Sequence, residues 1–384
     1  DDIAGLWAQA HAVGPETLQA SYNFDDIDIA KDIVEKSRQG HKQVLIGDYS
    51  NWFPERLAPA AFGSHHAART EAMQYVIDNL NPNLELHILK GLGSIGIQHN
   101  KYTLFSGPSG TLLQAGSFNY TKNSQLRHWE NVVFTADKAR VAAYSEYFQW
   151  LLRRSRPYAP DLQPEDPVLD PSDPIPQPAA GPVSLHGVPF PAASFSPDGG
   201  TEGWLVRAED GVRKSLDILM FSPFPTPAMS QAILSLLSKG VPVRLVSDAD
   251  EVKRATPLVP LVKAGLQLRS IHGPDVAVRH EPATFASKMH EKVMLFDAGG
   301  PDGLAKMGDS LNISHNAFVH NFENVGFWGP AEAAILQAHF DYVWSLANEV
   351  EQALLDDLST QYEREQSQAA AAADPTRSEG PRSG

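Results

Sequence analysis

Apolar and polar positions follow one order twice along this 384-residue chain. Each half has a short β-type run, then a stretch with helical spacing, then an apolar strand that ends in aspartate. These elements are residues 18–24, 27–39 and the strand ending at Asp48, and residues 218–224, 227–239 and the strand ending at Asp248. A glycine, Gly40 or Gly240, stands eight residues before each aspartate. Strand, helix and strand in that order predict a right-handed βαβ unit, and its repetition predicts a duplicated fold.

Proline divides the chain between these repeats. Nine prolines stand between residues 157 and 182, and such a stretch can form neither a helix nor a central strand. We therefore expect an extended linker, and a disordered tail from about residue 366, where five alanines precede a polar end. The expected divisions are residues 1–155, 156–199, 200–350 and 351–384. The fold class is α/β, with two duplicated α/β/α halves related by a pseudo-twofold axis and a single active site between them.

A short motif gives this duplication its chemistry. The second half contains A-S-K-M-H-E-K-V-M-L-F-D, in which His290 and Lys292 stand two residues apart and four apolar residues separate Lys292 from Asp297. On a strand, positions i and i+2 face the same side, so His290 and Lys292 would enter one pocket. The first half repeats the spacing with His99 and Lys101, but it has Ser106 where the second half has Asp297.

The match continues beyond this motif. The segment G-S-F-N at 116–119 aligns with D-S-L-N at 309–312, and a glutamate followed by asparagine stands eleven residues after each final asparagine. The paired positions are Ser117 and Ser310, Asn119 and Asn312, and Glu130 and Glu323.

These residues resemble the phospholipase D superfamily, whose signature is a duplicated H-x-K-x4-D followed by G-S-x-N and an acidic residue. The resemblance covers residues 16–154 and 200–347. It implies that the motif aspartate mainly supports its strand, so Ser106 should weaken support more than chemistry. Asp309, in place of a glycine, would add negative charge beside the pocket.

The resemblance also implies roles for the site residues. His99 is the expected nucleophile, which attacks phosphorus, and His290 the general acid that protonates the leaving alcohol and then activates water. Lys101 and Lys292 supply positive charge to the phosphate. Amides of Asn119 and Asn312, and hydroxyls of Ser117 and Ser310, donate to the same oxygens. Glu130 and Glu323 fix the histidine tautomers.

No metal or cofactor is expected, because the lysines already neutralise the phosphate. The adjacent His65 and His66 are more typical of a solvated loop than of a metal site. We expect His128, His315 and His320 to lie beside the motif residues or on the surface. The segment with Trp52, Phe53 and Phe62 fits a packed surface loop better than a lipid-binding one.

The leading function is a phospholipase D-type phosphodiesterase or phosphatidyltransferase acting on a phospholipid. A metal-independent nuclease is the first alternative, which the net charge of −15 disfavours. A decayed binding module is the second, supported only by Ser106 and Asp309. We expect a monomer with transient membrane-surface contact and no nucleic-acid partner. No apolar run reaches the roughly 18 residues of a membrane span, and the start at Asp1 without a leader suggests a secreted or periplasmic protein.

Overall fold

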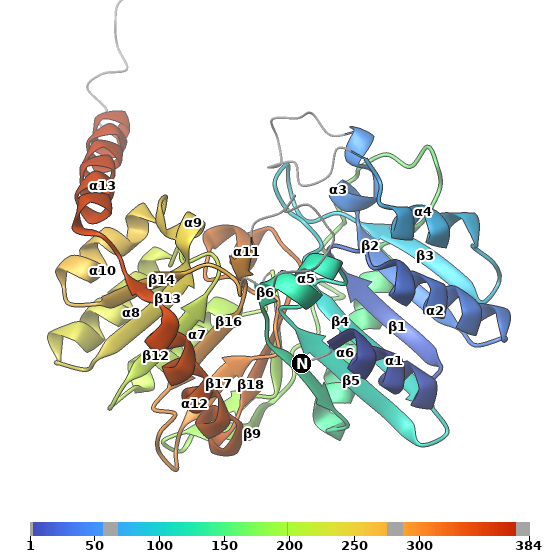
Figure 1. The fold of residues 1–384 in the computed structure, drawn as a ribbon, viewed down its shortest axis with the longest axis horizontal. Coiled ribbons are helices and arrows are strands. Elements are labelled where there is room, and N and C mark those ends of the chain that lie inside the picture. The colour runs from blue at the N-terminus through green and yellow to red at the C-terminus, as the bar shows by residue number, and fades with distance from the viewer. Residues whose placement is uncertain (1–2, 57–67, 198, 275–286, 374–384) are drawn as a thin grey trace, which may run out of the picture.

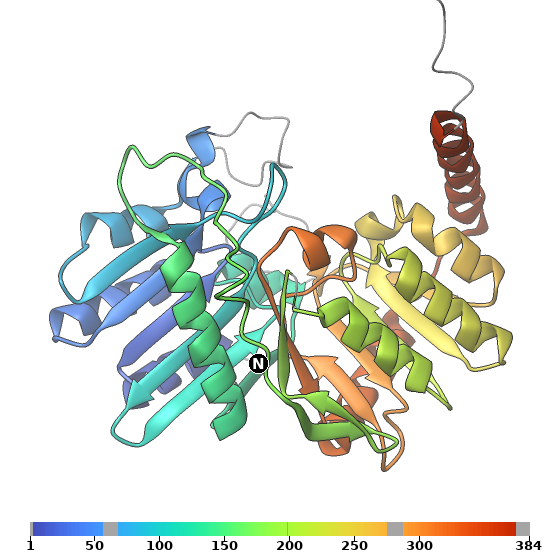
Figure 2. The same ribbon diagram turned by 180° about the vertical axis from the view of Figure 1, so that it is seen from behind.

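The computed structural model describes residues 3–56, 68–197, 199–274 and 287–373. They fold into two α/β halves that lie side by side (Figures 1 and 2), each built on one mixed sheet. His65, His66, Phe62 and the last eleven residues lie outside the described ranges. No helix within these ranges combines the length and apolar character that crossing a membrane requires.

The first sheet has the strand order β7-β5-β4-β1-β2-β3-β8. Its strands are β1 Glu16–Ser21, β2 Gln43–Asp48, β3 Leu84–Leu89, β4 Lys101–Gly107, β5 Gly110–Gly116, β7 Val132–Thr135 and β8 Arg156–Pro157. The helices of this half are α1 Ile3–Val13, α2 Ile27–Arg38, α3 Tyr49–Trp52, α4 Glu71–Asp78, α5 Lys122–Arg127 and α6 Lys138–Arg154. The aromatic-rich helix predicted near residues 138–154 is α6.

The second sheet has the order β11-β18-β17-β16-β12-β13-β14-β19. Its strands are β11 Ala193–Ser196, β12 Leu216–Met220, β13 Val243–Asp248, β14 Gln267–Ile271, β16 Lys292–Phe296, β17 Leu304–Met307, β18 Glu323–Trp328 and β19 Asn348–Glu349. The helices are α7 Thr201–Gly211, α8 Pro227–Ser238, α9 Ala249–Val252, α10 Val259–Lys263, α11 His315–Val319, α12 Pro330–Leu346 and α13 Gln352–Ala373.

The two sheets repeat one topology, which confirms the predicted duplication. β1 pairs in parallel with β2 and antiparallel with β4, and β12 pairs in the same way with β13 and β16. Ser21 lies opposite Lys101 and Met220 lies opposite Lys292. Ser21 is therefore the counterpart of Met220, and the run that begins at residue 18 corresponds to one that begins at residue 217, not at residue 218.

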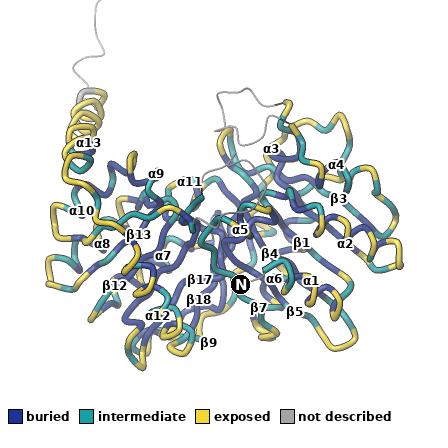
Figure 3. The backbone as a smooth tube through the Cα atoms, viewed as in Figure 1, coloured by how far each residue is buried: buried dark blue, intermediate teal, exposed yellow. Residues whose placement is uncertain are grey.

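Local sequence explains the crossover helices. Asp26 caps α2 by accepting hydrogen bonds from the backbone of Asp28 and Ile29, and Thr226 caps α8 by accepting one from Met229. Helices α2 and α8 each bury one apolar face against the sheet of their own half. Each half therefore has its own hydrophobic core, which Figure 3 shows as buried backbone. Both helices stop at glycines with positive φ, 93° at Gly40 and 76° at Gly240, a conformation that favours glycine.

The predicted linker is partly wrong at its C-terminal end. Residues 158–179 hold no helix or strand, as the prolines predict. However, β9 Ala180–Leu185 and β10 Val188–Pro191 form a separate two-stranded sheet, where prolines are tolerated at edges. No proline stands between Pro191 and Pro197, so every residue there can donate a backbone hydrogen bond. Strand β11 accordingly pairs with β18. The second half therefore begins before residue 200.

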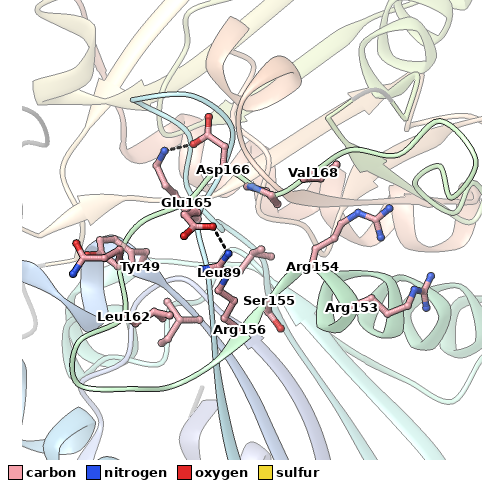
Figure 4. Close-up of a pocket in the computed structure, with 14 residues that line it drawn as sticks. Tyr49, Leu89, Arg153, Arg154, Ser155, Arg156, Leu162, Glu165, Asp166 and Val168 are labelled. Atoms are coloured by element: carbon pink, nitrogen blue, oxygen red, sulfur yellow. Dashed lines mark hydrogen bonds and ion pairs between the residues drawn. The ribbon is translucent and has the colours of Figure 1, made fainter.

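The extended part of the linker is fastened to the first half by ion pairs. Lys90 pairs with Asp166 and Arg156 pairs with Glu165 across the pocket drawn in Figure 4. Arg154 also pairs with Asp173 at 3.0 Å. In each pair the carboxylate is exposed, so each contributes little to stability, and together the pairs fix the path of the linker and neutralise basic side chains of the pocket.

The predicted tail is also corrected. The alanine run lies inside α13, because alanine has the highest helix propensity. Leu358 of this helix is buried, and Glu365 accepts a hydrogen bond from Thr256 at 2.9 Å. The chain is therefore helical as far as Ala373, beyond the point where disorder was expected.

Candidate active site

Each motif histidine lies just before the strand that carries its lysine. His99 and His290 are 6 % exposed, and Lys101 and Lys292, at the start of β4 and β16, are fully buried. Lys101 Nζ donates to the His99 carbonyl at 2.8 Å, and Lys292 Nζ donates to the His290 carbonyl at 2.7 Å. The alternation of a strand thus places histidine and lysine on one side, as the spacing predicts.

The two halves exchange their glutamates. His99 Nδ1 lies 2.7 Å from Glu323 Oε2, so the histidine of the first half pairs with the carboxylate of the second. His290 Nδ1 lies 2.9 Å from Glu130 Oε1, which is the reverse arrangement. Sequence order suggested that the glutamates orient the histidines, but it gave no sign of this crossing.

Backbone contacts hold the crossing in place. The His99 N–H donates to the Phe322 carbonyl at 2.9 Å, and the His290 N–H donates to the Trp129 carbonyl at 3.0 Å. Each carbonyl belongs to the residue before the paired glutamate. Strand β15 Lys288–Met289 also pairs with β6 His128–Trp129, which joins the halves through main-chain hydrogen bonds.

The strand-ending aspartates support the histidines from behind. Asp48 Oδ2 accepts from the Gln98 N–H at 2.8 Å, and Asp248 Oδ2 accepts from the Met289 N–H at 3.0 Å. Both donors are the residues directly before the motif histidines. The repeated aspartate was visible in the sequence, but its role was not.

The serines act on the glutamates, which differs from the expectation that they face the phosphate. The Ser117 hydroxyl donates to Glu130 Oε2, and the Ser310 hydroxyl donates to Glu323 Oε2 at 2.6 Å. The same hydroxyls accept from the backbone N–H of the following asparagines, Asn131 at 3.0 Å and Asn324 at 3.1 Å. Each serine therefore fixes the carboxylate that holds a histidine.

The motif asparagines have unsatisfied side chains. The Oδ1 atoms of Asn119 and Asn312 are buried and have no hydrogen-bond partner among the described residues. Buried amides normally find a partner. Both orphan atoms are acceptors, so a group that donates a hydrogen bond, such as an alcohol hydroxyl, would complete them.

Aromatic rings line both sides of the site, and sequence reasoning missed them. The Tyr22 ring lies 4.8 Å from the His99 ring, with Lys101 Nζ 5.1 Å from its centre. Phe221 holds the same relation to His290, at 4.8 Å, and to Lys292, at 5.3 Å. Each aromatic residue directly follows β1 or β12. The sequence contained this pair, but the alignment of the two β-runs was off by one residue and did not place Tyr22 opposite Phe221.

Burial sets the protonation of the site. It lowers the pKa of His99 to about 4 although Glu323 opposes the shift, and it lowers the pKa of His290 well below its usual value against Glu130. Burial opposes ionisation of Glu130, but the neighbouring His290 lowers the pKa of that carboxyl overall. The resting pairs are therefore neutral imidazoles donating Nδ1–H to carboxylates, which leaves each Nε2 with a lone pair.

The lysines are perturbed in the same sense. Burial lowers the pKa of Lys292 to about 8 and that of Lys101 well below its usual value, while Glu130 and Glu323 favour the charged forms. A negatively charged ligand placed beside them would favour the charged ammonium groups further.

Asp309 is neutralised by a residue that the sequence analysis did not consider. Lys306 Nζ donates to Asp309 Oδ1 at 2.9 Å, and both side chains are fully buried. Burial raises the pKa of Asp309 to about 6, and Lys306 opposes that shift. The expected negative charge beside the pocket is therefore balanced by a lysine three residues earlier in K-M-G-D.

Asp297 lies at the far end of β16 from His290 and supports the backbone. Its carboxylate accepts from the backbone N–H groups of Arg213, Lys214 and Ser215 at 2.7–2.9 Å, and His186 Nε2 lies at 2.6 Å. Ser106, its first-half counterpart, contacts only the Thr111 hydroxyl among the hydrogen bonds described, at 3.0 Å. Asp297 is thus a structural residue, as the resemblance implied.

We expect Asp297→Ala to destabilise the protein by on the order of 3 kcal/mol, because it leaves three backbone donors without their charged acceptor. Urea unfolding followed by circular dichroism measures this change. The exposed Asp302, 3.6 Å from the other side of His186, gives the matched control Asp302→Ala, which should change stability little. Equal stability of both variants would contradict the supporting role.

The three histidines that flank the motifs lie in two settings. His128 Nδ1 lies 3.4 Å from Glu130 Oε1 and is thus beside the site. His315 and His320 lie on or next to α11 with their rings 6.0 Å apart. Trp52 and Phe53 are fully buried in the first core, so for these two residues the packed interpretation is confirmed.

A model of a known family matches both halves. The family described as cardiolipin synthase, phospholipase D-like domain, matches residues 15–152 and 207–344, well over half of the chain. The chain belongs to the phospholipase D superfamily. The two matched segments each contain one histidine–lysine motif and one of the crossed glutamates.

Relatives of this phospholipase D-like chain share part of its length. The mitochondrial cardiolipin hydrolase of Danio rerio is 35% identical over 113 residues, which cover 29% of this chain and 43% of that protein. The mitochondrial cardiolipin hydrolase of Xenopus laevis is 31% identical over 115 residues, which cover 30% and 47%. The chain thus spans about half the length of the curated relatives it matches.

Solved structures share the whole phospholipase D-like fold. Phosphatidylserine synthase from Haemophilus influenzae superposes with a TM-score of 0.67 at 11% identity, covering 96% of this chain and 92% of that one. Polyphosphate kinase from Porphyromonas gingivalis gives 0.53 at 11% identity, covering 93% and 53%. At such identity the likeness shows the fold alone.

Proposed function

We propose that this protein is a phosphodiesterase or phosphatidyltransferase that acts on a phospholipid through a phosphohistidine on His99. The observation that carries the proposal is the crossed pair of histidine–carboxylate contacts, each beside a buried lysine. This arrangement supplies a nucleophile, a proton donor and positive charge in one site, which are the groups that phosphodiester exchange requires.

In the first step, His99 Nε2 attacks phosphorus while Glu323 holds its Nδ1–H. The bond from phosphorus to the leaving alcohol breaks, and His290 donates a proton to that oxygen. Burial keeps His290 neutral in the empty site. A phosphodiester anion next to this imidazole would raise its pKa, so substrate binding itself favours the acid form.

In the second step, His290 is neutral again and accepts a proton from water as the water oxygen attacks phosphorus. The bond from His99 Nε2 to phosphorus then breaks, and the phosphomonoester leaves. An alcohol in place of water would give transfer by the same path. Lys101, Lys292 and the amides of Asn119 and Asn312 provide the donors for the phosphoryl oxygens in both steps.

A phospholipid is the substrate that the comparisons favour, since the matching family and relatives carry cardiolipin in their names. A nuclease would use the same groups, but the net charge of −15 disfavours a polyanionic substrate. A decayed binding module is disfavoured because both histidine–glutamate contacts are intact. Membrane-surface contact, a monomeric state and a secreted or periplasmic location stay predictions.

The proposal is tested with vesicles of defined phospholipids, including cardiolipin and phosphatidylglycerol, and with single-stranded DNA in parallel. We expect release of an alcohol head group together with phosphatidic acid, or a new phosphatidyl ester when an acceptor alcohol is added. Mass spectrometry of the lipids distinguishes hydrolysis from transfer. Cleavage of DNA without any change in the lipids would favour the nuclease instead.

A further inference from the structure

One side of the site has a third potential metal ligand. Among the described residues, His128, Glu130 and His290 form a group whose ligand atoms all lie within 4.8 Å of one another. His290 Nδ1 lies 2.9 Å from Glu130 Oε1, and His128 Nδ1 lies 3.4 Å from the same oxygen. Two histidines and one glutamate are a common ligand set for Zn²⁺.

These distances suit a tetrahedral ion. Ligand atoms that each lie about 2.1 Å from a tetrahedral Zn²⁺ are separated from one another by about 3.4 Å. The distance from His128 Nδ1 to Glu130 Oε1 has this value, and the distance from His290 Nδ1, 2.9 Å, is somewhat shorter. The His128 side chain is 11% exposed, so it has access to solvent and some freedom to turn toward an ion. The Ser117 hydroxyl donates to Oε2 of Glu130, which also lies 3.0 Å from His290 Nδ1, whereas His128 Nδ1 is near Oε1.

The other side of the site lacks the third ligand. Asn321 takes the position that His128 has in the first half, two residues before the glutamate, and its Nδ2 donates to Glu323 Oε1 at 2.9 Å. An amide is a much weaker ligand for Zn²⁺ than an imidazole. Among the described residues, His99 and Glu323 are the two potential ligands that remain there, so the potential metal site belongs to one histidine of the pair.

We propose that His128, Glu130 and His290 form an inhibitory site for a divalent transition-metal ion such as Zn²⁺. The ion would bind Nδ1 of His290 and replace its hydrogen bond to Glu130. The proton of the neutral imidazole then resides on Nε2, which therefore has no lone pair with which to accept a proton from water. Bound metal thus blocks the base step, and this inhibitory consequence rests on the proposed function, whereas the binding does not.

Binding is measured first, without substrate, on protein freed of metal by dialysis against a chelator. Zn²⁺ is titrated by calorimetry and in competition with a chelating dye. We expect one ion per chain in the unmodified protein and affinity weakened by about 10-fold or more in His128→Asn, since even losing an outer partner of a ligand costs that much. His41→Asn, a histidine outside the group, should bind as the unmodified protein does.

The converse variant gives an independent check. Asn321→His places an imidazole two residues before Glu323, so it should bind a second ion. Circular dichroism confirms that each variant is folded. Unchanged affinity in folded His128→Asn, or no binding by the unmodified protein, would overturn the site.

Inhibition is measured separately, as the ratio of each variant's activity with Zn²⁺ to its own activity in chelator. The ratio should rise toward one in His128→Asn in parallel with weakened binding. If Zn²⁺ binds as expected but no phosphodiester is cleaved under any condition, only the proposed function fails. If Zn²⁺ binds through His128 and leaves activity unchanged, the inhibitory consequence is wrong.

Discussion

His99→Ala should abolish turnover of every phosphodiester, by roughly 10⁴-fold or more, because it removes the proposed nucleophile. His290→Ala should behave differently with a p-nitrophenyl phosphodiester, whose leaving group needs no proton. The first step then proceeds while hydrolysis of the phosphohistidine stalls, because the base that activates water is missing. Stopped-flow absorbance should show a burst of about one p-nitrophenolate per enzyme.

The identity of the labelled histidine decides between the two assignments. Peptide mapping of the stalled His290→Ala enzyme should place the phosphoryl group on His99. A burst in His99→Ala with the label on His290 would reverse the roles, and the absence of a burst in both variants would refute the covalent path. With an alkyl leaving group, His290→Ala should lose about 10²- to 10⁴-fold in rate and show no burst.

The second prediction follows from the crossed contacts. Glu323→Gln should resemble loss of His99 and slow formation of the phosphohistidine. Glu130→Gln should resemble loss of His290 and slow hydrolysis of the phosphohistidine. Each glutamate thus acts with the histidine of the opposite half of the chain. An amide cannot hold the imidazole as a carboxylate does, so we expect losses on the order of 10²- to 10⁴-fold. Single-turnover kinetics with the p-nitrophenyl ester separates the two steps.

A matched control for these variants stands within the motif itself. Glu291, between His290 and Lys292, is buried but points to the other face of the strand, where it contacts His339 at 2.7 Å. Glu291→Gln should keep both steps within a few-fold of the unmodified enzyme. If each glutamate variant instead impaired the step of the histidine in its own half, the crossed pairing would be wrong as an account of catalysis.

Local patterns carry much of this structure. The spacing of His290 and Lys292 predicted their common side because alternation along a strand is a property of the backbone alone. The repeated order of strand, helix and strand likewise predicted both sheets. The β-strand at Ala193–Ser196 was missed because its partner, β18, lies more than a hundred residues away and a short run after prolines carries no strong pattern of its own.

Contacts across the two halves were beyond such reasoning. Nothing in H-W-E-N or N-F-E-N says which histidine each glutamate meets, because that depends on how the sheets dock. The serines were assigned to the phosphate for the same reason, since a hydroxyl suits either acceptor and only the folded arrangement directs it to a carboxylate. Lys306 was overlooked because the need for a lysine to neutralise Asp309 is apparent only when Asp309 is known to be buried.

The exchange of glutamates has a consequence for synthesis of the protein. His99 meets its carboxylate partner 224 residues later in the chain, so a ribosome has finished the entire first half long before that partner exists. A nascent first half can complete its own sheet and still display a histidine with no group to orient it. Under the proposed function, hydrolytic capacity would arrive only when the completed second half docks and supplies Glu323 to His99.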